Sequence, residues 1–257
     1  MGSVPYGVAL ELQLAARAGV KSGEGAERLL LLEHPHVYTL GRNAEAADVL
    51  APPDWLAARG VEVVECDRGG QVTYHGPGQL VGYPIVNLSP DRRDVRRYVR
   101  DLQEALIRTL AELGLVAHPR EGPEHIGVWV GDEKIASIGV HLSRWVTTHG
   151  FALNLATDLS YFAGIIPCGL RQVRMTSVER LLGSAPPLAH VAVRFAHHFG
   201  EIFGRDLVDG VALGAGHPAR EPAGAGGDPA DSTAQLPAPT EPPAPDEPLR
   251  EPAGAAS

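Results

Sequence analysis

Short apolar runs, separated by turn residues, fill the middle of this sequence and limit the folds open to it more than any other feature. The runs predict strands at residues 28–33, 61–66, 72–75, 80–88, 126–130, 134–142 and 145–155. Helical patterns occupy residues 7–19, 94–113 and 188–203. Gly131-Asp132-Glu133 between two of the runs indicates a hairpin. We therefore expect one α+β domain with a mixed, largely antiparallel sheet flanked by helices.

The composition changes near Gly214. Ten of the 22 prolines lie between Gly214 and Ser257, where only Leu236 and Leu249 could anchor a core. Such a segment cannot bury enough apolar surface to offset the entropy of ordering it. We therefore expect a folded catalytic domain at 1–213 and a disordered, acidic Pro/Ala-rich tail at 214–257. The tail has a net charge of −5, which leaves −4 of the total −9 for the rest of the chain, so the overall acidity says little about a partner.

The remaining composition favours a cytoplasmic protein. No apolar run approaches the roughly 18 residues that span a bilayer, and the first residues do not resemble a signal peptide. Two cysteines do not make a disulfide framework.

Only Lys21 and Lys134 are lysines among the 22 basic residues. Because lysine, unlike arginine, can exchange its proton readily, Lys134 within an ordered segment is a candidate functional residue, with chance placement as the alternative.

The glycine-rich segment Arg68–Pro84, RGGQVTYHGPGQLVGYP, has the composition of a binding loop. Glycine allows the backbone to approach a ligand closely, and polar side chains are interleaved with the glycines. An ordinary Gly-Pro-Gly turn is the alternative, but a turn does not require Arg68, Thr73 or His75. The segment is not a phosphate loop, because GxxxxGK[ST] is absent and no GxGxxG opens a helix.

A second segment, Lys134–Leu155, combines small residues with large apolar neighbours. An apolar slot with a few polar groups at its mouth would suit an alkyl chain with a polar carbonyl end. An eight-carbon tail could gain roughly 5 kcal/mol there, at ~0.8 kcal/mol per buried CH₂. Ordinary sheet packing explains the small residues equally well if this segment is taken alone.

A third segment, Ile165–Val178, contains Cys168 between proline and glycine, with Arg171 and Arg174 following. Nearby cations lower the pKa of a thiol and raise its thiolate fraction, so Cys168 is a candidate nucleophile. Cys66 ends a valine-rich strand and is typical of a buried apolar filler.

Together these segments resemble the lipoyl(octanoyl) transferase family, the octanoyl-[acyl-carrier-protein]:protein N-octanoyltransferases. The resemblance covers roughly residues 5–205 and rests on RGGQVTYHGPGQLVGYP, on KIASIG with THGFALNL, and on PCG followed by TSV. It implies the fold of the biotin and lipoate protein ligases, with Cys168 as the acyl-thioester cysteine and Lys134 as its proton-exchanging partner. It also implies that substrate is contacted by Arg68, Gly69, Gly70, Gln71, Val72, Thr73, Tyr74, His75, Ser137, Ile138, Gly139, Gly150, Phe151 and Ala152. The tail has no counterpart in the family.

The resemblance further implies a ping-pong transfer without ATP, metal or other cofactor. The donor would be octanoyl-acyl-carrier protein. The acceptors would be lipoyl-domain proteins, namely the E2 subunits of 2-oxoacid dehydrogenases and the glycine cleavage H protein. We expect no nucleic-acid or membrane partner.

Three alternatives remain open at this point. One is an ATP-dependent lipoate or biotin ligase of the same fold, and another is an inactive binding module, against which Lys134 and Cys168 together argue. The third is a metal protein, but neither His34 with His36 nor His197 with His198 has the i, i+4 spacing of a helical zinc motif.

Overall fold

A computed structural model describes residues 2–122, 125–166 and 173–208 of the chain. Its main sheet has the strand order β1-β5-β8-β7-β6, and β9 pairs with β7. The strands are β1 (Arg28–Leu32), β5 (Gln79–Ile85), β6 (Gly127–Val130), β7 (Glu133–Ser143), β8 (Val146–Asn154) and β9 (Arg174–Met175). All neighbours along this order are antiparallel, and only β9 joins β7 in parallel.

A smaller sheet has the order β3-β2-β4. It consists of β2 (Val37–Leu40), β3 (Glu62–Glu65) and β4 (Val72–His75), with β2 parallel to β3 and antiparallel to β4. Short helical segments complete this part of the molecule: η1 (Ala46–Asp48), α2 (Pro53–Ala58) and η3 (Leu159–Gly164). Tyr38, Tyr74 and Phe162 form the centre of its apolar core.

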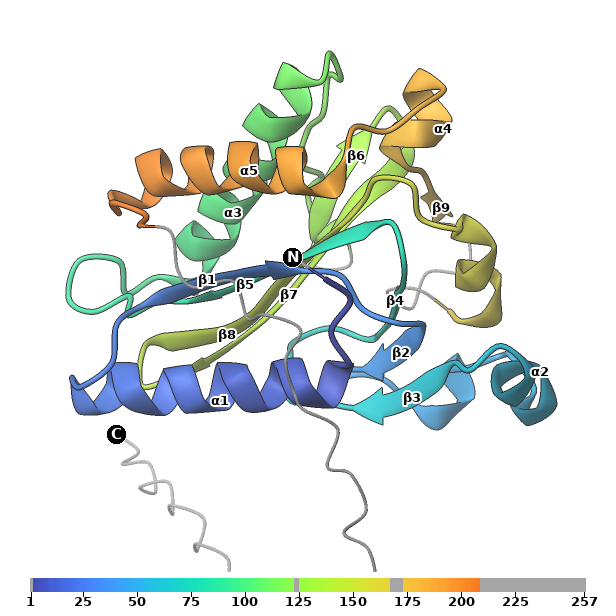
Figure 1. Ribbon diagram of the computed structural model, residues 1–257, viewed down its shortest axis with the longest axis horizontal. Helices are drawn as coiled ribbons and strands as arrows, with labels where there is room; N and C mark the ends of the chain where they lie inside the picture. Colours follow the sequence, from blue (N-terminus) through green and yellow to red (C-terminus); the bar gives the residue numbers. More distant parts are fainter. Residues whose placement is uncertain (1, 123–124, 167–172, 209–257) are drawn as a thin grey trace, which may run out of the picture. The chain divides into compact units, whose positions relative to one another are not determined.

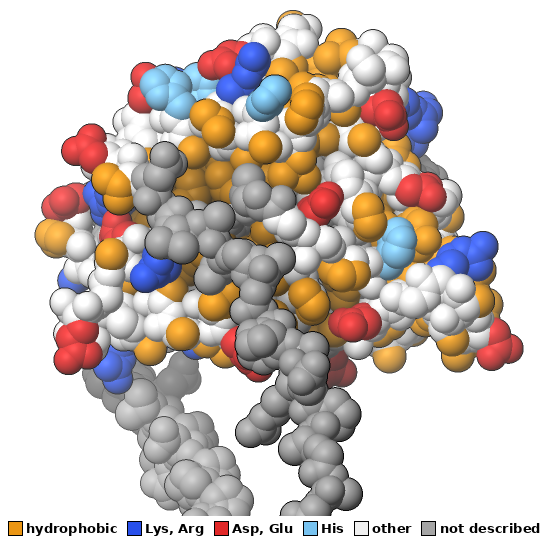
Figure 2. All heavy atoms as spheres, in the orientation of Figure 1, with side chains coloured by type: hydrophobic (Ala, Val, Ile, Leu, Met, Phe, Trp, Pro, Cys, Tyr) orange, Lys and Arg blue, Asp and Glu red, His pale blue; other side chains and the backbone are white. Residues whose placement is uncertain are grey.

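Helices cover both faces of the main sheet (Figure 1). The helices α3 (Val95–Glu112) and α5 (Leu188–Phe203) pack on one face, where Leu102, Phe195 and Phe199 are fully buried against the strands. The helix α1 (Tyr6–Ser22) packs on the other face, and α4 (Val178–Leu182) follows β9. Figure 2 shows hydrophobic side chains at the centre of the visible surface and charged ones toward its rim.

The expected α+β class with a mixed, largely antiparallel sheet is confirmed, as are the three expected helices. The Asp94 side chain caps α3 by accepting from the Arg97 amide, and Gly114 just beyond the helix has φ 84°. The pattern missed β2, β9, α2 and α4, which have two to six residues each. Such short elements depend on their neighbours and have no period of their own.

Two expectations about organisation have different outcomes. No helix in the described part of the chain is long and apolar enough to cross a membrane. The expected boundary between residues 213 and 214, and the tail beyond it, lie outside the described residues.

Candidate active site

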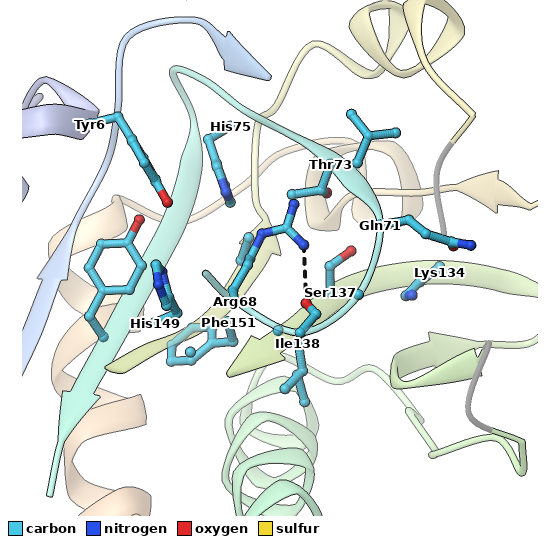
Figure 3. Close-up of a pocket in the computed structure, with 17 residues that line it drawn as sticks. Tyr6, Arg68, Gln71, Thr73, His75, Lys134, Ser137, Ile138, His149 and Phe151 are labelled. Carbon is cyan, nitrogen blue, oxygen red and sulfur yellow. Dashed lines mark hydrogen bonds between the residues drawn. The ribbon is translucent and has the colours of Figure 1, made fainter. Parts of the chain in front are cut away.

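A pocket opens between β7 and β8 of the main sheet and the segment that leads into β4 (Figure 3). Its empty volume is about 520 Å³, part of which is open to solvent. Most of the expected substrate-contact residues line it: Arg68, Gly69, Gly70, Gln71, Val72, Thr73, His75, Ser137, Ile138, Gly139, Gly150, Phe151 and Ala152. The fold therefore brings together two segments that are more than 60 residues apart in the sequence.

The small residues in these segments let backbones approach one another closely. Gly139 on β7 and Gly150 on β8 are register partners. A Cβ atom at Gly139 would lie 2.9 Å from the Gly69 carbonyl oxygen, and one at Gly150 would collide with the Gly82 carbonyl oxygen. Any side chain here would push the glycine-rich segment or β5 away from the pocket.

Arg68 is a structural member of the pocket wall. It is only 7% exposed, and its guanidinium donates to Thr39 Oγ1 at 3.2 and 2.9 Å and to the Thr39 carbonyl oxygen. A further bond joins its Nη1 to the Gly69 carbonyl oxygen at 3.2 Å (Figure 3). The Gly69 amide in turn donates to the Val140 carbonyl oxygen at 2.9 Å. These bonds fix the segment at residues 68–70 between the two sheets.

A chain of hydrogen bonds runs from His75 into the main sheet. His75 Nδ1 donates to Gln79 Oε1 at 2.8 Å, and Gln79 Nε2 donates to Asn154 Oδ1 at 2.9 Å. Asn154 Nδ2 donates to the Thr176 carbonyl oxygen at 3.0 Å. Burial and the neighbouring His34 hold the pKa of His75 well below its usual value, so its ring is neutral at pH 7.

Lys134 lines the pocket and is 1% exposed. Its Nζ lies 5.7 Å from the centroid of the Trp129 ring. A Cβ atom at Gly127 would lie 2.5 Å from Lys134 Cε, so a glycine is needed to accommodate the lysine side chain. The expected partner, Cys168, lies outside the described residues.

Tyr74 does not line the pocket, in contrast to its neighbours Thr73 and His75. Its hydroxyl bonds to His36 Nδ1 at 2.7 Å, and its ring stacks on Tyr161 with centroids 4.9 Å apart. The reason is the period of a strand, because successive side chains of β4 point to opposite faces. A sequence motif names a run of residues but not the face on which each one lies.

Tyr6, Tyr83 and His149 also line the pocket, and the expected set did not include them. Tyr83 and His149 stand inside the recognised motifs, so the motifs could have indicated them. Tyr6 comes from α1, and no local signal in the sequence points to it. His149 has an unusual left-handed backbone, with φ 57°.

Among the described residues, one group of side chains could hold a metal ion: His197, His198 and Glu201, whose ligand atoms lie within 4.8 Å of one another. The same side chains are engaged in ion pairs. His198 Nε2 lies 2.7 Å from Glu112 Oε1, and His197 Nε2 lies 3.5 Å from Glu201 Oε1. The group is on α5 and outside the pocket.

Solved structures confirm the fold. A lipoate-protein ligase A bound with ATP superposes with a TM-score of 0.64 at 20% identity, over 77% of this chain and 82% of that one. A bi-partite lipoate protein ligase from Thermoplasma acidophilum gives a TM-score of 0.64 at 18% identity, over 82% and 84%. At these identities the likeness concerns the fold alone.

The sequence comparisons are more specific. A family model described as the lipoyl protein ligase A/B catalytic domain matches residues 5–200. An octanoyltransferase of Solibacter usitatus (strain Ellin6076) is 52% identical over 215 residues, which cover 84% of this chain and 96% of that protein. An octanoyltransferase of Rubrobacter xylanophilus is 50% identical over 205 residues, which cover 79% and 91%. The chain belongs to the lipoyl protein ligase A/B family and, within it, to the octanoyltransferases.

Proposed function

We propose that this octanoyltransferase takes its octanoyl group from an acyl-carrier-protein thioester, holds it as a thioester on Cys168 and passes it to a lysine of a lipoyl domain. The observation that carries the proposal is Lys134, a lysine with 1% exposure in the wall of a pocket built from the family's glycine-rich segments. A lysine is seldom buried unless its ammonium group has a task or a partner.

The first half-reaction is an exchange between thioesters. The Cys168 thiolate attacks the carbonyl carbon of the carrier thioester, and the bond to the carrier sulfur breaks as the bond to the Cys168 sulfur remains. Lys134 supplies a proton to the departing carrier thiolate and is left as the neutral amine. Because a thioester is exchanged for a thioester, this step needs no ATP.

The second half-reaction forms an amide. The amine of the target lysine attacks the acyl-enzyme carbonyl, its excess proton passes to the neutral Lys134, and the Cys168 thiolate leaves. The product amide is more stable than the thioester, which drives the transfer. The pocket supports this course because its apolar wall, which includes the half-buried Ile138 and the buried Phe151, shields the alkyl chain from water.

The acceptors are lipoyl-domain proteins, the E2 subunits of 2-oxoacid dehydrogenases and the glycine cleavage H protein. A structural neighbour of the same fold, the bi-partite ligase from Thermoplasma acidophilum, belongs to a lipoylation system with an E2 lipoyl domain. That relation supports the same class of acceptor for this chain.

Intact-protein mass tests the covalent step. After incubation with octanoyl-acyl-carrier protein and without ATP, the wild-type chain gains the mass of one octanoyl group, and Cys168→Ser gains none. Cys66→Ser is the matched control and keeps both the adduct and the transfer, since the Cys66 thiol donates to the Leu40 carbonyl oxygen at 3.3 Å. Near-normal transfer by Cys168→Ser would refute the thioester mechanism.

A further inference from the structure

Three side chains of α5 converge on one point. His197 Nε2 lies 3.5 Å from Glu201 Oε1, and His198 Nδ1 lies 3.6 Å from Glu201 Oε2. The possible ligand atoms of all three residues lie within 4.8 Å of one another. Because Glu201 follows His197 by four residues and His198 by three, the helix places them on one face. A glutamate therefore supplies the i, i+4 spacing that the histidine pair lacks.

The ring of His198 is oriented by α3. His198 Nε2 donates to Oε1 of Glu112, the last residue of α3, at 2.7 Å. Since a carboxylate only accepts, the proton of the neutral ring is on Nε2, and Nδ1 keeps its lone pair. A carboxylate behind the ring is the usual partner of a metal-binding histidine, because it fixes the ring and makes the other nitrogen a better ligand.

His198 Nδ1 is buried and has no hydrogen-bond partner within the described part of the chain. His198 is only 9% exposed, and the nearest carboxylate oxygen, at 3.6 Å, is too distant for a hydrogen bond. A buried polar atom left without a partner is unfavourable. A second proton on each histidine would place two positive charges around the single carboxylate of Glu201, whereas one metal ion would satisfy all three side chains at once.

The spacing of the three side chains fits the coordination sphere of zinc. Ligands held tetrahedrally at about 2.0–2.1 Å from the ion lie about 3.4 Å from one another. The observed separations from Glu201 are 3.5 and 3.6 Å. The side chains of His197 and Glu201 are 65% and 51% exposed, so they can adjust, and water can complete the sphere. Two imidazoles and a carboxylate suit zinc, whereas Mg²⁺ and Ca²⁺ take oxygen ligands.

The ends of the two helices also favour a cation. Glu201 lies in the last turn of α5 and Glu112 ends α3, where the helix dipoles are negative. Arg194 lies 3.4 Å from Glu112, and Arg108 lies 3.9 Å from Glu201. Exposed pairs of this kind are weak, so a divalent ion bound directly by Glu201 can replace its contact with Arg108.

We propose that His197, His198 and Glu201 bind one zinc ion, with Glu112 as the carboxylate that orients His198. The ion would stabilise the contact between α5 and the end of α3, which pack on the same face of the main sheet (Figure 1). The proposal goes beyond the proposed acyl transfer and does not depend on it, because none of these four residues lines the pocket.

Zinc binding to the full chain, freed of metal by dialysis against a chelator, tests the site. We would measure affinity by competition with a chromophoric chelator and Tm with and without Zn²⁺. Glu201→Gln and His197→Gln replace exposed side chains, so both variants should fold. Each should weaken the binding of one zinc equivalent at least tenfold and reduce the Tm increase that zinc causes in the wild type. His190→Gln is the matched control, at an exposed histidine of α5 outside the group, and should bind zinc as the wild type does.

Glu112→Ala tests the orienting carboxylate and should weaken zinc binding about 10- to 100-fold, as loss of such a partner does in known zinc sites. Zinc affinity unchanged in both Glu201→Gln and His197→Gln would overturn the proposal, because any bound zinc would then lie elsewhere, for example at a cysteine. A wild-type chain that binds no zinc, or whose Tm rises equally with Mg²⁺, would overturn it as well.

Discussion

Lys134 on β7 and Met175 on β9 are register partners, and the Thr176 amide donates to the Lys134 carbonyl oxygen at 2.9 Å. The contact fastens the backbone of Lys134 to the segment that follows Cys168 in the sequence. It uses main-chain atoms only, so a change of the Lys134 side chain leaves it intact. The chemical role of the ammonium group can therefore be tested without detaching β9.

Lys134→Arg should lower kcat/KM for octanoyl transfer by about 100-fold or more, because an arginine keeps the charge but cannot exchange a proton near neutral pH. The pH dependence of thiol alkylation at Cys168 should shift in the same variant. Lys21→Arg is the control, since Lys21 is exposed and donates to Ser143 Oγ at 2.7 Å, outside the pocket. Wild-type kinetics in Lys134→Arg would contradict the proton-exchanging role.

Gly150→Ala should destabilise the pocket. Its Cβ would collide with the Gly82 carbonyl oxygen and lie 2.7 Å from Pro84 Cδ, and relief of such contacts typically costs about 1–3 kcal/mol. We expect a lower Tm together with a higher KM for the octanoyl carrier. Gly7→Ala is the comparison, because nothing lies within 4 Å of its added methyl group and alanine is favoured in a helix by roughly 0.5–1 kcal/mol. Equal Tm values for the two variants would show that β5 can move aside.

Stability should fall as the pH drops below about 6.5. Burial lowers the pKa of His34 to about 4 and also lowers those of His75 and His149. The unfolded chain, with histidine pKa values near 6.5, then binds more protons than the folded chain, so acid favours unfolding. His34 alone accounts for about 3 kcal/mol between pH 7 and pH 4.

Urea unfolding at pH 7, 6 and 5 measures this dependence. His34→Gln removes one titrating group, so the free energy of unfolding should fall less steeply as the pH drops. This holds whatever the effect of the substitution on stability at pH 7. His197→Gln, at a side chain with 65% exposure, should leave the slope as in the wild type. The same slope in all three proteins would show that His34 is not responsible.

The exposed arginines of α3 are a candidate docking surface for the acidic carrier. Arg96, Arg97 and Arg100 on α3 are exposed, and so is Arg93, which precedes the helix. Arg97 lies 3.8 Å from Asp101, and Arg93 bonds to Ser89 Oγ, so part of this surface is paired locally; a solvated surface of locally paired charges is the alternative to docking. An exposed ion pair of this kind contributes little in water, so it hardly opposes the attraction of the arginines for an acidic partner.

Arg96→Glu combined with Arg97→Glu should raise KM for octanoyl-acyl-carrier protein and spare a small octanoyl thioester. The effect should shrink between low salt and 0.15 M, where the Debye length is about 8 Å. Equal effects on both substrates, or none on either, would exclude this surface as the docking site.

Local patterns in the sequence determined the three long helices and most of the strands, and the motifs determined most of the pocket wall. Asp94 and Gly114 mark the ends of α3 because a cap and a left-handed residue act within a single turn. Gly139 and Gly150 were recognisable because close packing of backbones excludes every side chain.

Only the tertiary structure decided which of these residues face the ligand. Tyr74 points away from the pocket, although it stands between two residues that line it. Tyr6 reaches the pocket from α1, and Asp67 meets His149 across 82 positions of the chain. Such contacts arise from the burial of apolar surface between elements distant in sequence, and that burial depends on the whole fold and leaves no trace in the local pattern.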